Sequence, residues 1–599
     1  MSHVIARLGP ARRGADVLTA PTSEPGIGRR MLRVFLASWA VLFALMACWS
    51  LSDPILAAPD EPAHVVKAAG VIRGELTGEP DPDIGGIRYV PTPQWMEGIY
   101  KFNQCWAMKR DTPAGCMADV DGALEPEGTT FTGAGTYNPV YYALVGWPTL
   151  FLEDEAAIMG VRLASALLSA AVLASGLAAL AARRRSSWSF VASGIALTPM
   201  VLFLGGHVNI SGLEIMAGFA LACWLGLLVD RERRVGTGPV VWGVAITAAI
   251  LANTRSVGPV WLAAIALALV LDGWVWPRLV RSRQFWLAAA FLAATSLFAL
   301  WWTLSMGGDE VRDPGRGAGE TPFLKGAEYM LSKTLEAGAG YVGIFGWLDT
   351  PLPMTEANIW SGLLFAVCAA AVVMGRGWSR VRIIALILAF AALPALVQGM
   401  SWNTHGYIWQ PRYLLAVVLA LVVTAGAVLD EHAPPPHALR RGRAAVLVLA
   451  AGLWAMHVFA IAWNLRRYVT GLEEPEVPWS AMVTAPDWQP PLTWPGLLAL
   501  AAIAAGAWCW LVARWALRLT AAEDLPASWL GASDRPGAAR RAVEAGGSPA
   551  GAPDAGEDAP AEAGADDARG EIEPEADGPA DGEAPAEAAP AQAPSTTER

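Results

Sequence analysis

The sequence predicts an all-α membrane protein, a polytopic bundle of about twelve transmembrane helices whose outer loops carry short helices. Three observations support this class. Hydrophobic residues make up 54% of the 599 residues, charged residues make up only 16%, and the mean hydropathy is +0.38. Apolar runs of about 20 residues, the length that crosses a bilayer, recur along the chain. Arginine clusters separate these runs. Such a chain is too apolar for an ordinary soluble protein.

The expected transmembrane domain covers residues 31–517 and follows a cytoplasmic N-terminal segment, residues 1–30, without stable structure. Its first apolar run is too long for the core of a cleaved signal peptide, so we expect an uncleaved anchor. The twelve expected helices occupy residues 31–52, 157–182, 188–206, 212–230, 238–254, 256–274, 285–303, 358–375, 383–399, 412–430, 443–465 and 494–517.

The arginine clusters fix the expected orientation of the helices. With twelve crossings, all seven clusters fall on one side, which the positive-inside rule makes cytoplasmic. Both termini are then cytoplasmic, and three long loops face outward, residues 53–156, 304–357 and 466–493. Usage rich in alanine, arginine and glycine suggests a bacterium, so we expect the bacterial cytoplasmic membrane.

Residues 138–152 are apolar enough to be counted as a further crossing. That crossing would place the arginine cluster 183–185 on the outer side. We therefore expect a helix lying at the outer interface, with Tyr141 and Tyr142 at headgroup level.

The C-terminal tail carries the acidity of the chain. Residues 521–599 contain 18 acidic residues and five arginines, a net charge of −13, whereas the whole chain carries −11. The remaining body is nearly neutral, which gives no sign of nucleic-acid binding. The tail is rich in Ala, Pro, Gly, Glu and Asp, so we expect residues 518–599 to be disordered and cytoplasmic. Its sequence does not identify a cytoplasmic partner.

The cysteines and the absence of known motifs limit the chemistry. Cys105 and Cys116 are the only two of the six cysteines in an outer loop, and we predict that they form a disulfide. The other four lie in apolar segments and are expected to be small core residues. No P-loop, dinucleotide fingerprint, Ser-His-Asp pattern or zinc motif occurs, so we expect no cofactor.

The strongest candidate site is Asp60-Glu61-Pro62-Ala63-His64, directly after the first apolar run. One interpretation is a helix start, with Asp60 as the cap and Pro62 in the first turn. Capping explains one carboxylate, but not two carboxylates and a histidine. If a helix begins here, His64 lies about one turn from both acids, and the three could share a proton network or a divalent cation.

Other polar residues gather at the expected outer helix ends, among them Arg162, Arg255, Arg412 and Tyr413. Each arginine has a simpler explanation, which is snorkelling to the interface. Several arginines near one leaflet also suit a phosphate group. The helices around Asn253-Thr254-Arg255-Ser256 are short, so the turn between them is expected to lie below the outer surface, in a cleft beneath Asp60.

Four separated motifs resemble the domain-of-unknown-function 2142 family of membrane proteins. They are Asp60-Glu61-Pro62-x-His64, Tyr137-Asn138-Pro139-x-Tyr141-Tyr142, Gly346-Trp347-Leu348-Asp349-Thr350-Pro351-Leu352-Pro353 and Gln410-x-Arg412-Tyr413-Leu414. The resemblance runs from about residue 31 to 517. More distantly, the plan is similar to the GT-C class of glycosyltransferases, in which an acidic residue of the first outer loop is catalytic, an interfacial helix follows and the next crossing opens with an arginine.

This resemblance implies an inverting transferase that moves a sugar from a polyprenyl-phosphate donor to a cell-envelope acceptor on the outer face. Asp60, or Glu61 as the second choice, would be the base, and Arg255, Arg412 and Arg162 would bind the lipid phosphate. The alternatives are a transporter or flippase of lipid-linked precursors and a non-catalytic membrane scaffold. Charges at the outer helix ends and the lack of a repeat favour the enzyme.

Overall fold

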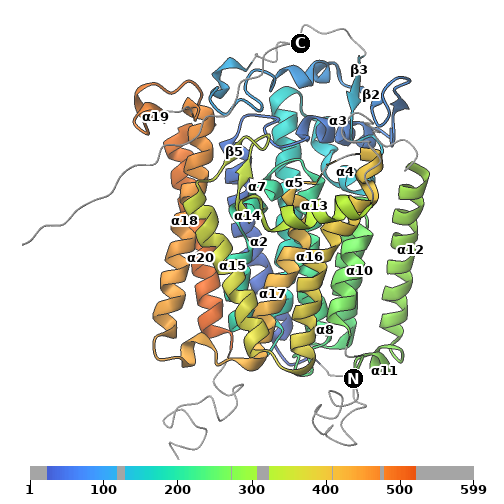
Figure 1. Ribbon diagram of the computed structural model, residues 1–599, viewed down its shortest axis with the longest axis vertical. Coiled ribbons are helices and arrows are strands. Elements are labelled where there is room, and N and C mark those ends of the chain that lie inside the picture. Colours follow the sequence, from blue (N-terminus) through green and yellow to red (C-terminus); the bar gives the residue numbers. More distant parts are fainter. Residues whose placement is uncertain are drawn as a thin grey trace, which may run out of the picture. The chain divides into compact units, whose positions relative to one another are not determined.

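The computed structural model describes residues 23–117, 128–271, 273–306, 323–336, 338–405, 407, 409–472 and 478–520. The predicted acidic tail from residue 521 onward, and most of the predicted N-terminal segment, lie outside these residues. Within the described part, helices dominate (Figure 1). The longer ones are α2 (Ile27–Ser52), α5 (Asp154–Ala181), α8 (Ile210–Leu228), α12 (Arg283–Met306), α15 (Met354–Met374), α16 (Gly377–His405), α17 (Leu415–His432), α18 (Gly442–Thr470) and α20 (Thr493–Arg518).

The remaining elements are short. The helices are α3 (Glu61–Ile72), α4 (Val140–Val145), α6 (Ser187–Ala196), α7 (Pro199–Gly206), α9 (Thr237–Ala252), α10 (Gly258–Leu269), α11 (Trp276–Leu279), α13 (Phe323–Glu336), α14 (Gly338–Val342) and α19 (Ala481–Thr484). Turns of 3-10 helix include η5 (Trp147–Leu150) and η6 (Pro411–Leu414). The strands are β1 (Glu79–Pro80), β2 (Arg88–Thr92), β3 (Gly128–Thr132), β4 (Ile344–Phe345) and β5 (Thr350–Pro351).

The described residues contain nine or ten candidate membrane spans, fewer than the twelve predicted. Nine helices are long and apolar enough to cross a bilayer, and α6 and α7 form a tenth candidate that bends by 69°. The bend follows from Pro199, which starts α7 while the Thr198 side chain caps it. With 16 and 12 residues, α9 and α10 reach only about 24 and 18 Å, short of a 30 Å hydrocarbon core.

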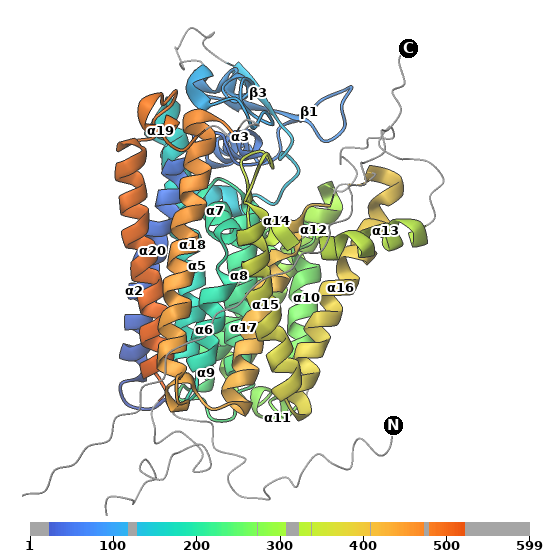
Figure 2. The ribbon, with the colours of Figure 1, turned by 60° about the vertical axis from the view of Figure 1, so that its left-hand side comes forward.

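The bundle has a buried centre and an exposed periphery. Helices α8 and α17 are almost fully buried, whereas α12 and α15 expose most of their apolar surface. Along one side, α18 and α20 lie together, and α12 and α16 lie on the other (Figures 1 and 2). An apolar surface on peripheral helices is what a lipid environment requires, because the hydrocarbon takes the place of a protein partner.

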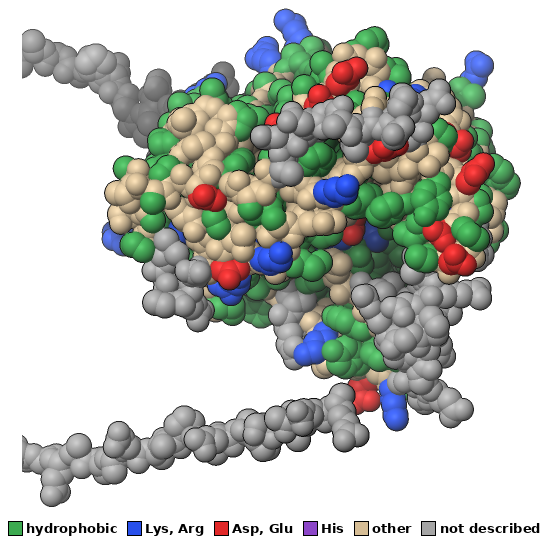
Figure 3. All heavy atoms as spheres, turned by 90° about the horizontal axis from the view of Figure 1, so that it is seen from above, with side chains coloured by type: hydrophobic (Ala, Val, Ile, Leu, Met, Phe, Trp, Pro, Cys, Tyr) green, Lys and Arg blue, Asp and Glu red, His purple; other side chains and the backbone are tan. Residues whose placement is uncertain are grey.

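One end of the bundle, here called the loop end, carries α3, the β1–β3 sheet and α19 (Figures 1 and 2). The sheet is antiparallel in the order β1-β2-β3, with Arg88 opposite Thr132. The Thr132 hydroxyl donates a 2.8 Å hydrogen bond to the Ala63 carbonyl, which ties the sheet to α3. Charged side chains of both signs are scattered among apolar ones on this face (Figure 3).

The opposite end collects the arginine clusters. Arg183 contacts both Asp230 and Glu431, each at 3.3 Å, and Arg184 contacts Glu24 at 2.6 Å. Basic clusters that are distant in sequence therefore meet at one end of the bundle. The placement of this end in the cytoplasm stays a prediction.

The region predicted as an interfacial helix consists of two short pieces, α4 and η5. Tyr141 and Tyr142 are fully buried within the protein, so they do not face lipid headgroups. Their hydroxyls lie 2.9 Å from Ser165 Oγ and 2.8 Å from His64 Nδ1, so each has a buried polar partner. The exposed aromatic residues of this stretch are Trp147 and Phe151.

A disulfide joins Cys105 and Cys116, whose Cα atoms lie 6.1 Å apart. The backbone of this loop is held by Arg467, which donates to the carbonyls of Trp106 and Lys109 and to Asp349 Oδ2 at 3.1 Å. The Gly346 to Pro353 motif therefore anchors the disulfide loop to the bundle.

Candidate active site

The backbone turns sharply between the two carboxylates. Asp60 precedes α3 with φ 63° and ψ 7°, a left-handed conformation that Asp tolerates better than most residues. Asp60 occupies the N-cap position of α3, as the helix-start interpretation expects, but its side chain makes no capping hydrogen bond. The turn sends the neighbouring side chains into different environments. The Asp60 side chain is 55% exposed, whereas the Glu61 side chain is fully buried.

Glu61 forms a buried ion pair with Arg162 of α5. Arg162 Nε lies 2.8 Å from Oε1 and Nη2 lies 2.6 Å from Oε2, a bidentate arrangement. The backbone N–H groups of Val208 and Ala58 also donate to the carboxylate. Burial alone would raise the pKa of Glu61, but the charge and hydrogen bonds of Arg162 hold that pKa below its usual range.

Arg162 has no donor left for a ligand. Besides Glu61, its guanidinium donates to the carbonyls of Ser50, Asp53 and Pro54, and its side chain is fully buried. This geometry contradicts the expectation that Arg162 binds a substrate phosphate. It also removes Glu61 from reach of a substrate, since all its oxygen atoms are engaged below the surface.

Asp60 instead pairs with Arg412 of η6. Arg412 Nη2 lies 2.6 Å from Asp60 Oδ2, and the Arg412 side chain is only 3% exposed. The other buried guanidinium nitrogens, Nε and Nη1, have no hydrogen-bond partner among the described residues. A buried cation with unused donors carries a desolvation cost that an anionic ligand would offset.

Arg255 lies next to the same tyrosine as Arg412, Tyr413. Its guanidinium carbon is 4.0 Å from the centre of the Tyr413 ring, and that of Arg412 is 5.4 Å from the same ring. Arg255 Nη1 is buried without a hydrogen-bond partner among the described residues. The turn between α9 and α10 thus presents a second cation close to the first.

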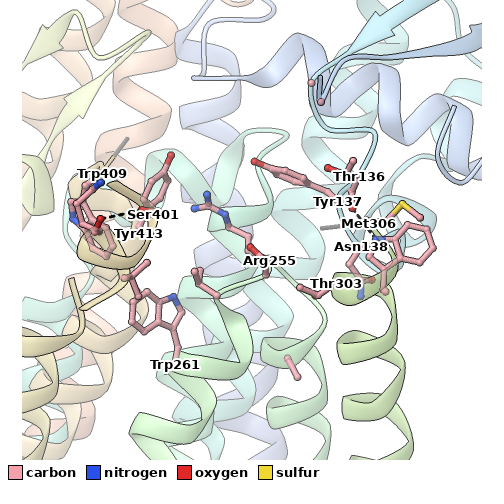
Figure 4. Close-up of a pocket in the computed structure, with 18 residues that line it drawn as sticks. Thr136, Tyr137, Asn138, Arg255, Trp261, Thr303, Met306, Ser401, Trp409 and Tyr413 are labelled. Atoms are coloured by element: carbon pink, nitrogen blue, oxygen red, sulfur yellow. Dashed lines mark hydrogen bonds between the residues drawn. The ribbon is translucent and has the colours of Figure 1, made fainter. Parts of the chain in front are cut away.

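Two adjoining cavities lie next to Asp60, Arg255 and Tyr413. One, of about 390 Å³, is lined by Asp60, His64 and Gln410, and the other, of about 350 Å³, is lined by Arg255, Trp261 and other residues. Figure 4 shows Arg255 pointing between Tyr137 and Tyr413 in the second cavity. The two cavities adjoin because they share four lining residues, which are Gly133, Tyr137, Trp409 and Tyr413. Both volumes are typical of small-molecule sites.

His64 lies beside Asp60 in the first cavity and is buried. Burial lowers the pKa of His64 to about 4, with Arg412 and Arg255 lowering it further and Asp60 opposing them. His64 is therefore neutral near pH 7. Its Nδ1 hydrogen bond with Tyr142 fixes the ring orientation.

A second buried polar contact holds the segment before Asp60. His207 Nε2 lies 3.0 Å from Asp53 Oδ2, and both side chains are buried. Asn209 caps α8 and donates to the Pro59 carbonyl at 3.0 Å. The backbone next to Asp60 is thus fixed by α7 and α8.

The expected site residues divide into two groups. Asp60, His64, Arg255 and Tyr413 line the two cavities. Arg412 lines neither cavity but contacts Asp60, and Glu61 and Arg162 also lie outside the cavities. Among the described residues, no three His, Cys, Asp or Glu side chains come together as a metal site.

Several aromatic residues of the site were not predicted, among them Trp409 and Trp261. Trp409 lies in both cavity walls and directly precedes the Gln410-Pro411-Arg412 motif, so its position offered a signal. Trp261 lines the Arg255 cavity with its ring centre 6.5 Å from that of Trp409. As one of 28 tryptophans, it had no distinguishing feature in the sequence.

Comparison with known proteins gives one family match and distant structural similarity. Residues 43–421 match the family model described as "Predicted membrane protein (DUF2142)". No curated protein matches the sequence significantly. The fold is similar to the crystal structure of ArnT from Cupriavidus metallidurans bound to undecaprenyl phosphate, with 13% identity, a TM-score of 0.40, and coverage of 82% of this chain and 77% of that one. Its apo structure gives 13% identity, a TM-score of 0.37, and coverage of 81% and 77%.

Proposed function

This chain belongs to the DUF2142 family of membrane proteins, and we propose that it is a glycosyltransferase that uses a polyprenyl-phosphate sugar. The observation that carries the proposal is the exposed Asp60 carboxylate, which is held by the buried Arg412 and lines one of two adjoining cavities. The transfer takes place at the loop end. The arginine-rich opposite end favours an outward-facing loop end in a bacterial cytoplasmic membrane.

The Asp60 cavity would receive the acceptor. Arg412 engages Oδ2 of Asp60, which leaves Oδ1 for an acceptor hydroxyl. The neutral His64 and the amide of Gln410 line the same space and can hydrogen-bond a polyhydroxylated substrate. A base must reach the proton that it removes, and among the two acidic neighbours only Asp60 faces a cavity.

The Arg255 cavity would receive the donor. Its walls are mainly aromatic and apolar, which suits the first part of a lipid chain, and Arg255 stands where this cavity meets the other. Arg255 and Arg412 both lie close to the Tyr413 ring and have buried, unused N–H groups. Their donors would hold the phosphate oxygens.

The reaction then needs no further activation of the donor. Asp60 takes the proton of the acceptor hydroxyl while its oxygen bonds to the anomeric carbon. The bond between that carbon and the phosphate oxygen breaks, and the lipid phosphate leaves with the electron pair. Arg255 and Arg412 stabilise the charge that develops on this oxygen. Attack opposite to the leaving group inverts the anomeric configuration.

The test separates binding from transfer. We expect Asp60→Asn to abolish transfer in cells that lack the native protein, because a positioned base contributes about 10² to 10⁴ in rate. The purified Asp60→Asn protein should still bind undecaprenyl phosphate, whereas Arg255→Gln and Arg412→Gln should weaken that binding. Asp83→Asn, which alters an exposed acid of the same loop region, is the matched control.

Unchanged envelope glycans with Asp60→Asn would refute the role of Asp60 as the base. Undecaprenyl phosphate binding that is insensitive to both arginine substitutions would refute the phosphate site. If Asp60→Asn preserved glycan output while the arginine variants abolished it, transport of a lipid-linked precursor would replace transfer as the function.

A further inference from the structure

A groove lies at the end opposite the loop end, between the first turns of α18 and the last turns of α20. It has a volume of about 300 Å³ and is lined by Arg443, Leu447, Trp510, Arg514, Leu517 and Arg518. The two helices lie side by side in both ribbon views (Figures 1 and 2). Both are candidate membrane spans, so the groove is at a bilayer surface.

Along both helices, the residues that line the groove change from arginines near the helix end to apolar residues deeper in the bundle. Residues 510, 514 and 518 are four apart and share one face of α20, as residues 443 and 447 do on α18. Trp510 lies about 12 Å deeper than Arg518, and Leu447 about 6 Å deeper than Arg443, at 1.5 Å per residue. Trp510 and Leu447 are each 57% exposed, so the deeper part of the groove opens to the side.

The three arginines have no acidic partner among the residues that the structure describes. None of Arg443, Arg514 and Arg518 forms an ion pair with a described residue, although Arg183 and Arg184 at the same end do. Arg514 instead stacks on Trp510, with its guanidinium carbon 5.0 Å from the ring centre. Three like charges around one groove repel one another unless an anion lies between them.

We propose that this groove binds the headgroup of an anionic phospholipid. The phosphate lies among the three guanidinium groups, and the glycerol and upper acyl chains lie along Trp510 and Leu447. This occupant matches both parts of the groove, since clustered arginines between membrane helices suit anionic headgroups and tryptophan suits the interface. The acidic segment 521–599 has the opposite charge to the three arginines, but it does not match the apolar residues in the deeper part of the groove.

The experiment measures lipid binding by the full-length protein in neutral detergent after delipidation. The probes are dioleoylphosphatidylglycerol, dioleoylphosphatidylcholine and inorganic phosphate, with native mass spectrometry and thermal unfolding as readouts. The test variant combines Arg443→Gln, Arg514→Gln and Arg518→Gln. The matched control combines Arg281→Gln, Arg283→Gln and Arg376→Gln, which removes three exposed arginines from outside the groove.

Wild-type protein should prefer phosphatidylglycerol to phosphatidylcholine, and the test variant should bind phosphatidylglycerol on the order of 100-fold more weakly. The control should bind like the wild type, and a variant with three lysines at the groove positions should retain binding. Equal loss in the control, equal binding of phosphatidylcholine, or the same stabilisation by inorganic phosphate would overturn the proposal. If phosphatidylglycerol bound only after removal of residues 521–599, we would conclude that the acidic tail occupies the groove instead.

Discussion

Glu61→Gln should destabilise the protein far more than Asp60→Asn, although the two residues are adjacent. Glutamine has nearly the shape of glutamate, but it can accept only at one of the two oxygen positions. The amide group would face donors from Arg162 and Ala58 instead of accepting from them. The substitution also leaves a fully buried guanidinium without its counter-ion.

The structure sets the expected magnitudes. Removing one partner of a buried ion pair costs about 3–5 kcal/mol, because the remaining charge stays desolvated. Asp60 is 55% exposed and its amide analogue can still accept from Arg412, so that change should cost about 1 kcal/mol or less. The double variant Glu61→Gln/Arg162→Met should lose less unfolding free energy than the two single variants lose in sum, because it removes both charges together.

The assay is equilibrium unfolding of purified protein in mixed detergent micelles, followed by tryptophan fluorescence. All variants are compared at one pH and one detergent concentration. If Glu61→Gln unfolded like the wild type and still lost transfer, Glu61 would be acting on the substrate, and the division of roles between the two carboxylates would be wrong.

Three further changes test other parts of the structure. Gly346→Ala should destabilise the protein by about 1–2 kcal/mol, because φ is 61° and the new Cβ would clash with Asp349 Oδ1; thermal unfolding would reveal the loss. Replacing Cys105 and Cys116 by serine should cost about 3 kcal/mol in the chain-entropy account of an 11-residue loop, and dithiothreitol should lower the melting temperature of the wild type but not of the variant. Because the pKa of folded His64 is about 4 and that of an unfolded histidine is 6.5, the unfolded chain binds the proton first, so stability falls from pH 6.5 toward pH 4, by up to about 3 kcal/mol. His64→Gln should flatten this part of the pH profile, and an unchanged slope would contradict the buried, neutral histidine.

The helices were predictable because their formation depends on local composition. A run of about 20 apolar residues has few alternatives to a helix in a bilayer, so each expected segment contains helix. The number of membrane spans was harder to predict from the sequence. The break at Thr198-Pro199 interrupts a run that remains apolar throughout, and average hydropathy does not register one proline.

The candidate site was predictable in its members but not in its pairings. Glu61 meets Arg162 across 101 residues of sequence, and Asp60 meets Arg412 across 352. Which carboxylate faces the cavity depends on the left-handed turn at Asp60, and Asp and Glu side by side carry no sign of that turn. Only the three-dimensional arrangement separates the anchored acid from the accessible one.

The Glu61–Arg162 pair also sets an order for the biogenesis of the protein. The carboxylate is synthesised 101 residues before Arg162, its only ion-pair partner among the described residues, which arrives with α5. Until α5 enters the membrane, Glu61 remains hydrated and the segment before α3 lacks the guanidinium that gathers its carbonyl groups. The loop that carries the Cys105–Cys116 bridge is held only later, because Arg467, which contacts its carbonyl groups, lies in α18. The first loop therefore gains its contacts with the bundle in two steps, first at Arg162 and then at Arg467.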